Sequence, residues 1–161
     1  MDKKDGGVVV KVYFFRHGKA LRGGDDALRE LSIEGREETA RAAKLLAQAG
    51  VSGISRIYHS GLVRSVQTAE IIAAEVPPAE GLVQMEQITP FDQPEYCASL
   101  LIDLDVDVII AGHEPHLSHT ASFLMSGYID AVSIKFNYSG AICLEKSKNK
   151  QWYIVPIGGF E

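Results

Sequence analysis

The chain has 161 residues, 46% of them hydrophobic, and a formal net charge of −5 at pH 7. This length and composition predict a single domain, residues 1–161, with a sizeable core, and the acidic balance argues against nucleic acid or an anionic membrane as the main partner. Cys97 and Cys143 lack CxxC spacing, which argues against a disulfide framework or a zinc site, and no apolar run is long enough to span a bilayer. We therefore expect a cytoplasmic protein.

The first apolar segment, residues 8–18, reads VVVKVYFFRHG. Its β-branched and aromatic residues predict a strand that is buried on both faces. The carboxyl end of this strand would deliver Arg16 and His17 to a loop, which is where ligands collect in open α/β sheets. Taken alone, the pair is equally compatible with a solvated strand end.

The remaining segments predict an alternation of helices and strands. Ser32 as N-cap and Gly50 as stop predict a helix over 33–49, and Gly127 ends another helix that begins near Pro115. The other expected elements are strands over 56–58, 81–85 and 107–111 and helices over 62–74 and 93–101. Near the C-terminus, strands over 132–138, 141–144 and 152–156 are joined by turns short enough for antiparallel hairpins. The sequence therefore predicts a three-layer α/β/α sandwich with a mostly parallel sheet and antiparallel edge strands.

Polar residues follow three of the expected strands. His17 follows the first, the run from Ser60 to Arg64 follows the second, and Gly112-His113 follows a later one. Because the carboxyl ends of parallel strands lie at one edge of a sheet, two arginines and two histidines are expected to converge there. Guanidinium groups bind phosphate oxygens through paired hydrogen bonds, and a helix start adds amide groups. The composition of this pocket indicates a phosphoryl group.

These three stretches, RHG at 16–18, SGLVRSVQTA at 60–69 and GH at 112–113, resemble the signatures of the histidine phosphatase superfamily. That superfamily includes the cofactor-dependent phosphoglycerate mutases. The small size, Arg29-x-Leu31-Ser32-x-x-Gly35, Thr89-Pro90 and GHEPHLS at 112–118 are most similar to the small bacterial phosphohistidine phosphatases of the SixA type. The resemblance covers nearly the whole chain and implies a phosphoglycerate mutase-like fold without a metal or other cofactor.

By this resemblance, His17 is the nucleophile that takes up the phosphoryl group, and water then hydrolyses the phosphohistidine intermediate. Arg16, Arg64 and His113 hold the phosphoryl oxygens, since positioning and electrostatics supply most of the catalysis of phosphoryl transfer. Further substrate-binding positions implied are Gly18, Ser60 and Arg29. A simple surface charge before a helix is the alternative for Arg29.

The chain departs from the family pattern at three points. Gly61 stands where proline is usual, which predicts a looser turn before Arg64, and Ser65 replaces a common alanine. Larger members carry a longer segment with a glutamate that protonates the leaving oxygen. Here Glu86 and Glu114 are the possible proton donors, and an exposed structural glutamate is the alternative for each.

The lack of an obvious proton donor indicates a substrate whose leaving group needs no placed acid. A P–N bond to imidazole cleaves once the ring is protonated, and water supplies that proton near neutral pH, whereas an alkoxide needs a placed acid. Missing insertions also leave the pocket open to a side chain of another protein. We therefore expect a monomeric protein phosphohistidine phosphatase, whose partner is a histidine-phosphorylated carrier. The alternatives are a small-molecule phosphomonoesterase acting on a phosphorylated metabolite and a non-catalytic phosphate-recognition module.

Two other kinds of site are weighed against this one. His113, His116 and His119 recur every third residue beside Glu114, but steps of three drift around a helix and Pro115 interrupts any HExxH pattern. No metal is therefore expected, and His116 is a candidate for lining the pocket mouth. Neither GxGxxG nor GxxxxGK occurs, which argues against a nucleotide fold. The aromatic residues of 128–138 are expected to serve packing.

Overall fold

Six strands form one mixed sheet in the order β3-β2-β4-β1-β5-β6. The computed structural model describes residues 8–158. The strands are β1 (Val10–Arg16), β2 (Arg56–His59), β3 (Leu82–Gln84), β4 (Val108–Gly112), β5 (Ala141–Lys146) and β6 (Trp152–Val155). The neighbours β3, β2, β4 and β1 are parallel, whereas β5 pairs antiparallel with β1 and β6 antiparallel with β5. The prediction of a mostly parallel sheet with an antiparallel edge is confirmed.

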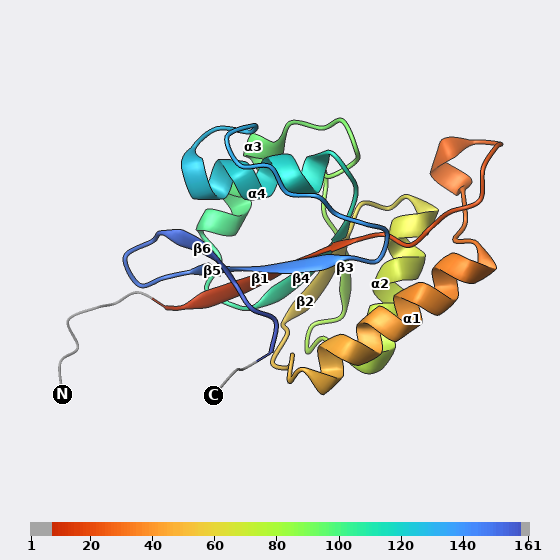
Figure 1. Cartoon of the computed structure of the whole chain (residues 1–161), viewed down its shortest axis with the longest axis horizontal. Helices are drawn as coiled ribbons and strands as arrows, with labels where there is room; N and C mark the ends of the chain where they lie inside the picture. The colour runs from red at the N-terminus through yellow and green to blue at the C-terminus, as the bar shows by residue number, and fades with distance from the viewer. Residues whose placement is uncertain (1–7, 159–161) are drawn as a thin grey trace.

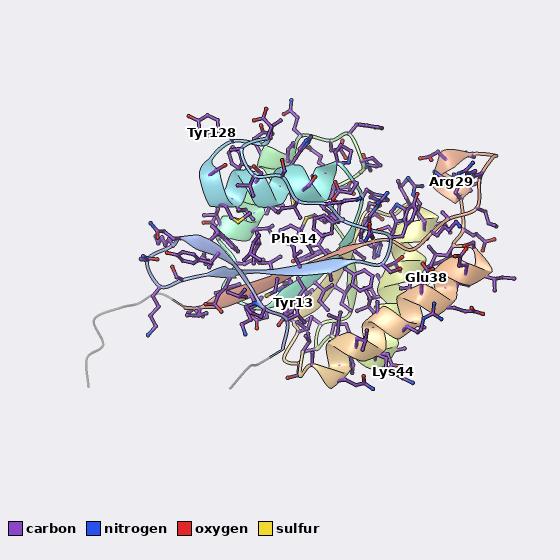
Figure 2. All side chains as sticks on the ribbon, in the orientation of Figure 1. Tyr13, Phe14, Arg29, Glu38, Lys44 and Tyr128 are labelled. Carbon is purple, nitrogen blue, oxygen red and sulfur yellow. The ribbon has the colours of Figure 1, made fainter. Side chains whose placement is uncertain are left out.

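Four helices cover the two faces of this sheet. Figure 1 shows α1 (Ile33–Gln48) and α2 (Val63–Glu75) on one face and α3 (Pro94–Ile102) and α4 (His116–Ser126) on the other. A short 3-10 helix, η1 (Asp26–Leu28), lies in the connection between β1 and α1. The predicted three-layer sandwich is therefore confirmed. Over residues 8–158, no helix combines the length and apolarity needed to cross a membrane.

The central strands are buried on both faces because each helical layer covers one of them. Along β1, Phe14 belongs to the core cluster that includes Leu101 of α3 and Leu117 of α4. The next residue, Phe15, belongs to the opposite cluster, which includes Ala43 of α1 and Ile72 of α2. Successive strand side chains point to opposite faces, so a strand covered on both sides needs apolar residues at nearly every position. This accounts for the apolar run over 8–15, which only Lys11 interrupts.

The predicted helix ends agree with local backbone chemistry. The Ser32 hydroxyl accepts a hydrogen bond of 2.9 Å from the Gly35 amide and so satisfies a free donor in the first turn of α1. At the end of α4, Gly127 has φ +82°, a left-handed conformation that glycine adopts without a steric penalty. The Ser32 cap and the Gly127 helix end could be predicted from the sequence because each depends only on neighbouring residues.

The predicted strand over 132–138 is wrong. This segment has no sheet partner, because β5 occupies the edge of β1 in the register Phe15↔Ala141. Residues 127–140 instead form an irregular connection that runs from α4 to the start of β5, beside the carboxyl end of β1 (Figure 1). Phe136 is buried within it and anchors it to the core. The turn at 139–140 therefore joins no hairpin, whereas the expected hairpin at 146–151 joins β5 to β6.

Candidate active site

The sheet register brings the three motif ends together. In the parallel ladder Arg16 of β1 lies opposite Gly112 of β4, and on the other side of β4 His59 of β2 lies opposite Ala111. The His17 amide donates to the Gly112 carbonyl at 2.9 Å, which extends the ladder one residue beyond the strands. As a result, the rings of His17 and His113 lie with centroids 5.0 Å apart. The predicted convergence of these two histidines is a direct consequence of β1 and β4 being neighbours.

The ring of His17 is held in one orientation. Its Nδ1 lies 2.7 Å from the Gly18 carbonyl, and because a carbonyl only accepts, Nδ1 carries the proton and Nε2 keeps its lone pair. Burial lowers the pKa of His17 to about 4, and the positive charges of Arg64, Arg16 and Arg29 act in the same direction. The ring is therefore neutral at pH 7, and Nε2 is free to attack an electrophile.

Gly18 is closely packed against neighbouring residues and so helps to hold the His17 ring. Its amide donates to Thr68 Oγ1 at 3.1 Å, and a Cβ at this position would lie 2.4 Å from Thr39 Oγ1. Only glycine fits the space, which accounts for the residue after the histidine. Since its amide and its carbonyl are both hydrogen-bonded within the chain, Gly18 positions His17, and the substrate contact expected for Gly18 stays a prediction.

His113 is fully buried and bonded to Ser60. The His113 Nε2 and Ser60 Oγ atoms are 2.6 Å apart, and the same oxygen accepts a bond of 3.3 Å from the Leu62 amide. When the hydroxyl hydrogen is donated to Nε2, the ring proton lies on Nδ1. That Nδ1 is buried and has no hydrogen-bond partner among residues 8–158. Ser60 therefore holds the Nε2 side of the His113 ring, and the substrate contact expected for Ser60 stays a prediction.

Electrostatics keep His113 neutral as well. Burial is the main cause that lowers its pKa, to about 2, and the nearby His17, Arg64, His116 and Arg16 add to the effect. A neutral imidazole with its proton on Nδ1 still donates one hydrogen bond. His113 is thus a donor whose availability does not depend on pH near neutrality.

Arg16 is fixed by the connection between α4 and β5. Its Nη1 donates to the Phe136 carbonyl at 2.8 Å, and its guanidinium carbon lies 4.1 Å from the centroid of the Tyr138 ring. The Nε of the same group is buried and has no acceptor within the described part of the chain. Because a guanidinium is always charged, this N–H donor is suited to an oxyanion.

Arg64 lies in the first turn of α2 and is 3% exposed. Its Nη1 donates to the Asp26 carbonyl at 2.9 Å, and its Nη2 lies 3.4 Å from Asp26 Oδ2. The other carboxylate oxygen accepts from Arg29 Nη1 at 3.0 Å, and Arg29 Nε donates to the Leu21 carbonyl. Asp26 thus ties two arginines together at the edge of the site. Arg29 lies close enough to His17 for its charge to lower the pKa of that ring.

The turn before Arg64 is closely fitted, in contrast to the loosening predicted from Gly61. Gly61 has φ +87°, and a Cβ there would lie 2.8 Å from Gln84 Nε2. Its amide donates to His59 Nδ1 at 3.1 Å. Proline fixes φ near about −65° and has no N–H, so the usual residue does not fit this backbone.

Ser65, the other departure from the family pattern, donates to the Ala111 carbonyl at 2.7 Å and accepts from the Ser60 amide. Gly61 and Ser65 therefore both fit the observed backbone of this turn.

The two candidate carboxylates differ in their surroundings. Glu86 is exposed, and its Oε1 lies 3.5 Å from Gln84 Nε2. Glu114 is partly buried; its Oε2 accepts from Ser118 Oγ at 2.6 Å, while its Oε1 is buried without a partner in the region described. Burial raises the pKa of Glu114, partly offset by the Ser118 hydrogen bond and the Arg16 charge. Glu114 is thus half-buried and close enough to Arg16 for that charge to act on its carboxyl group.

The histidines that follow on α4 do not form a metal centre. Within residues 8–158, no three His, Cys, Asp or Glu side chains are grouped so that they can hold a metal ion. His116, expected as a candidate for the pocket mouth, is 1% exposed, and both of its ring nitrogens lack partners among the described residues. His119 faces a groove of about 440 Å³ that is also lined by Phe91 and Pro115.

Two residues that contact the site were missed from the sequence. The sequence predicts no element or role for Asp26, and it predicts a packing role for Tyr138 at the end of a strand. Both lie in irregular connections, where periodicity carries no information on orientation. The only signal in the sequence is a carboxylate shortly before Arg29 and an aromatic residue beside the Ser139-Gly140 turn, and neither is specific.

The fold defines a phosphoglycerate mutase-like α/β protein. It is similar to the solved protein histidine phosphatase SixA complexed with tungstate, with a TM-score of 0.81, 22% identity and coverage of 90% of this chain and 94% of that one. An Agrobacterium tumefaciens protein described as a SixA phosphohistidine phosphatase has a TM-score of 0.75 at 24% identity, covering 91% and 95%. Phosphoglycerate mutase from Plasmodium falciparum has a TM-score of 0.69 at 14% identity, covering 96% of this chain and 95% of that one.

Residues 12–87 of the chain match the histidine phosphatase superfamily (branch 1). This segment contains Arg16, His17 and Arg64, and the resemblance found in the motifs is confirmed. Comparison with curated protein sequences gives no match.

Proposed function

We propose that this protein is a phosphatase that transfers a phosphoryl group from its substrate to His17 and then to water. The observation that carries the proposal is a set of buried hydrogen-bond donors around a neutral nucleophile. Arg16 Nε and His113 Nδ1 both lack an acceptor within the described chain, and His17 lies 5.0 Å from the His113 ring. Buried donors without acceptors are costly, and the oxygens of a phosphoryl group satisfy them.

In the first step, His17 Nε2 attacks phosphorus as the bond from phosphorus to the leaving atom breaks. The leaving group departs with the electron pair, and the phosphoryl group becomes bonded to His17. Arg16, Arg64 and His113 donate to the three equatorial oxygens and balance their charge, the main contribution in phosphoryl transfer. The hydrogen bond from His17 Nδ1 to the Gly18 carbonyl supports this step, because it stabilises the positive charge that the ring acquires.

In the second step, water attacks the phosphohistidine, the P–N bond to His17 breaks, and inorganic phosphate leaves. Glu114 is the proton donor and acceptor that the surroundings support better than Glu86. As an acid with a raised pKa, it protonates an oxygen leaving group, and as a carboxylate it then takes a proton from the attacking water. An imidazole leaving group takes its proton from water and needs Glu114 less.

Phosphohistidine on another protein is the substrate class that we favour. The motifs most resemble SixA-type phosphatases, and the SixA structure with tungstate is that of a protein histidine phosphatase bound to an oxyanion. The alternative, a small-molecule phosphomonoesterase, is supported by one observation, the partly buried Glu114 with its unpartnered oxygen. A placed acid is of use with sugar phosphates, which have poor leaving groups.

A panel assay tests the proposal. Wild type and His17→Ala are compared on a histidine-phosphorylated carrier protein, a sugar phosphate and an aryl phosphate, with phosphate release as the readout. We expect wild type to act fastest on the carrier and His17→Ala to be inactive on all three. High turnover on the sugar phosphate with none on the carrier would establish the alternative substrate class. Binding of phosphate without turnover of any substrate would identify a non-catalytic recognition module.

A further inference from the structure

The backbone around Tyr138 is bonded to the strand end that carries the nucleophile. The Ser139 amide donates to the Arg16 carbonyl at 3.1 Å, and the Arg16 amide donates to the Gly140 carbonyl at 2.9 Å. Ser139 has φ +58°, and its buried hydroxyl lies 2.9 Å from Thr39 Oγ1. These contacts hold the backbone on the C-terminal side of Tyr138 in a fixed relation to His17. The position of Tyr138 is therefore set by the site and not by the surrounding loop alone.

The Tyr138 side chain lies against both charged and nucleophilic groups of the site. The Arg16 guanidinium is 4.1 Å from the ring centroid, and the His17 ring centroid is 5.8 Å away with an interplanar angle of 49°. Yet Tyr138 is 43% exposed, whereas His17 is 7% exposed. The tyrosine ring thus lies beside the buried nucleophile and is itself open to solvent.

We propose that Tyr138 is a specificity-determining residue that favours substrates whose leaving group is a flat aromatic ring, such as the imidazole of phosphohistidine. This inference rests on the proposed function and names a feature of its substrate class. Aromatic rings attract one another at centroid separations of about 4.5 to 7 Å in tilted or offset geometries. A leaving ring bonded to a phosphorus beside His17 comes within that range of Tyr138, whereas a sugar or glycerol group offers no comparable face.

Two variants separate this contribution from the support that Tyr138 gives to Arg16. Tyr138→Phe keeps the ring, and Tyr138→Leu removes it while keeping an apolar side chain. We expect Tyr138→Leu to lower kcat/KM for phosphoimidazole and phenyl phosphate by about two- to tenfold relative to glycerol phosphate, the effect of one aromatic pair. Tyr138→Phe keeps the wild-type ratio. Equal losses on all three substrates would mean that Tyr138 acts only by positioning Arg16, and would overturn the inference.

A binding measurement keeps the inference separate from the proposed function. Phenylphosphonate and ethylphosphonate are not hydrolysed, so calorimetric titration of each protein reports the aromatic preference without turnover. We expect wild type and Tyr138→Phe to bind phenylphosphonate more tightly than ethylphosphonate, and Tyr138→Leu to lose that preference. An unchanged preference in a folded Tyr138→Leu protein, checked by its melting temperature, would overturn the inference. Inactivity of wild type on the phosphohistidine carrier, on phosphoimidazole and on every phosphate ester would instead count against the proposed function.

Discussion

The floor and the rim of the site are built in different ways. The floor consists of His17, Ser60, Arg64 and His113, which follow strands of the sheet and are each less than 10% exposed. The rim consists of Asp26, Arg29, Glu114 and Tyr138, which come from irregular segments or a helix start and are all more exposed than the floor residues. Sheet register fixes the floor, whereas loops place the rim. The chemistry is therefore expected to depend on the first set and the choice of leaving group on the second.

The largest effect is expected from a floor residue that contacts the phosphoryl group. Arg64→Ala removes a buried guanidinium, and we expect kcat to fall about a hundred- to thousandfold, the usual cost of losing one donor to the transition state. Arg64→Lys, which keeps the charge but not the paired donors, is expected to recover part of this loss. The measurement is steady-state kinetics on the best substrate of the panel. A kcat for Arg64→Ala within threefold of wild type would contradict the contact of Arg64 with the phosphoryl group, because a factor of three is roughly 0.65 kcal/mol in the activation barrier.

A rim residue is expected to act in a substrate-dependent way. Glu114→Gln removes the ionisable carboxyl, and we expect kcat on a sugar phosphate to fall about a hundredfold, the lower limit for general acid catalysis. On a P–N substrate the loss is expected to be smaller, because the imidazole takes its proton from water and only the hydrolysis of the phosphohistidine still uses the Glu114 carboxylate. Glu86→Gln is the matched control, since that glutamate is exposed, and it should leave both substrates unaffected. Equal losses for the two variants would show that neither is the donor.

A positioning residue of the floor is expected to have an intermediate effect. Ser60→Ala removes the hydroxyl that is hydrogen-bonded to His113 Nε2, and we expect kcat/KM to fall about tenfold, as for outer partners that orient a metal-ligating histidine. The control is Ser99→Ala, on the exposed side of α3. The 15N chemical shifts of His113 report which ring nitrogen carries the proton. Unchanged shifts in Ser60→Ala would contradict the assigned role.

The smallest effect concerns stability and not activity. Burial lowers the pKa of His116 to about 4 from an ordinary value of 6.5, with Asp92 opposing and His119 adding to the shift. Between these values the unfolded chain binds more protons than the folded one, so the free energy of unfolding rises with pH and is fully gained above about 6.5. His116 contributes at most about 1.4 kcal/mol per pH unit in this window.

His116→Leu removes this titration, and we expect a flatter dependence of the free energy of unfolding on pH between about 4 and 6.5. Urea denaturation at several pH values measures it. His17 and His113 have lowered pKa values too and contribute the same sign, so a slope persists in the variant. An identical slope in wild type and variant would mean that His116 is not kept neutral by burial.

Much of the fold was predictable because its signals are local. The apolar run of β1, the Ser32 cap and the Gly127 stop each depend on adjacent residues, and their elements formed close to the expected limits. The segment 132–138 has the composition of a strand but no free edge to join, since β5 pairs with β1. Pairing depends on the whole chain, and composition alone does not reveal it.

For the site, the sequence by itself determined which side chains follow the strands, and parallel pairing was enough to predict that Arg16, His17 and His113 converge. Tertiary structure alone decided how each is held: the Gly18 carbonyl fixes the tautomer of His17, Ser60 is hydrogen-bonded to His113, and Asp26 links Arg64 to Arg29. It also separated Glu114 from Glu86 and placed Tyr138 against His17. The alternation of side chains along a strand has a period that is written in the sequence, whereas burial and the direction of a side chain in a loop depend on neighbours that are distant along the chain.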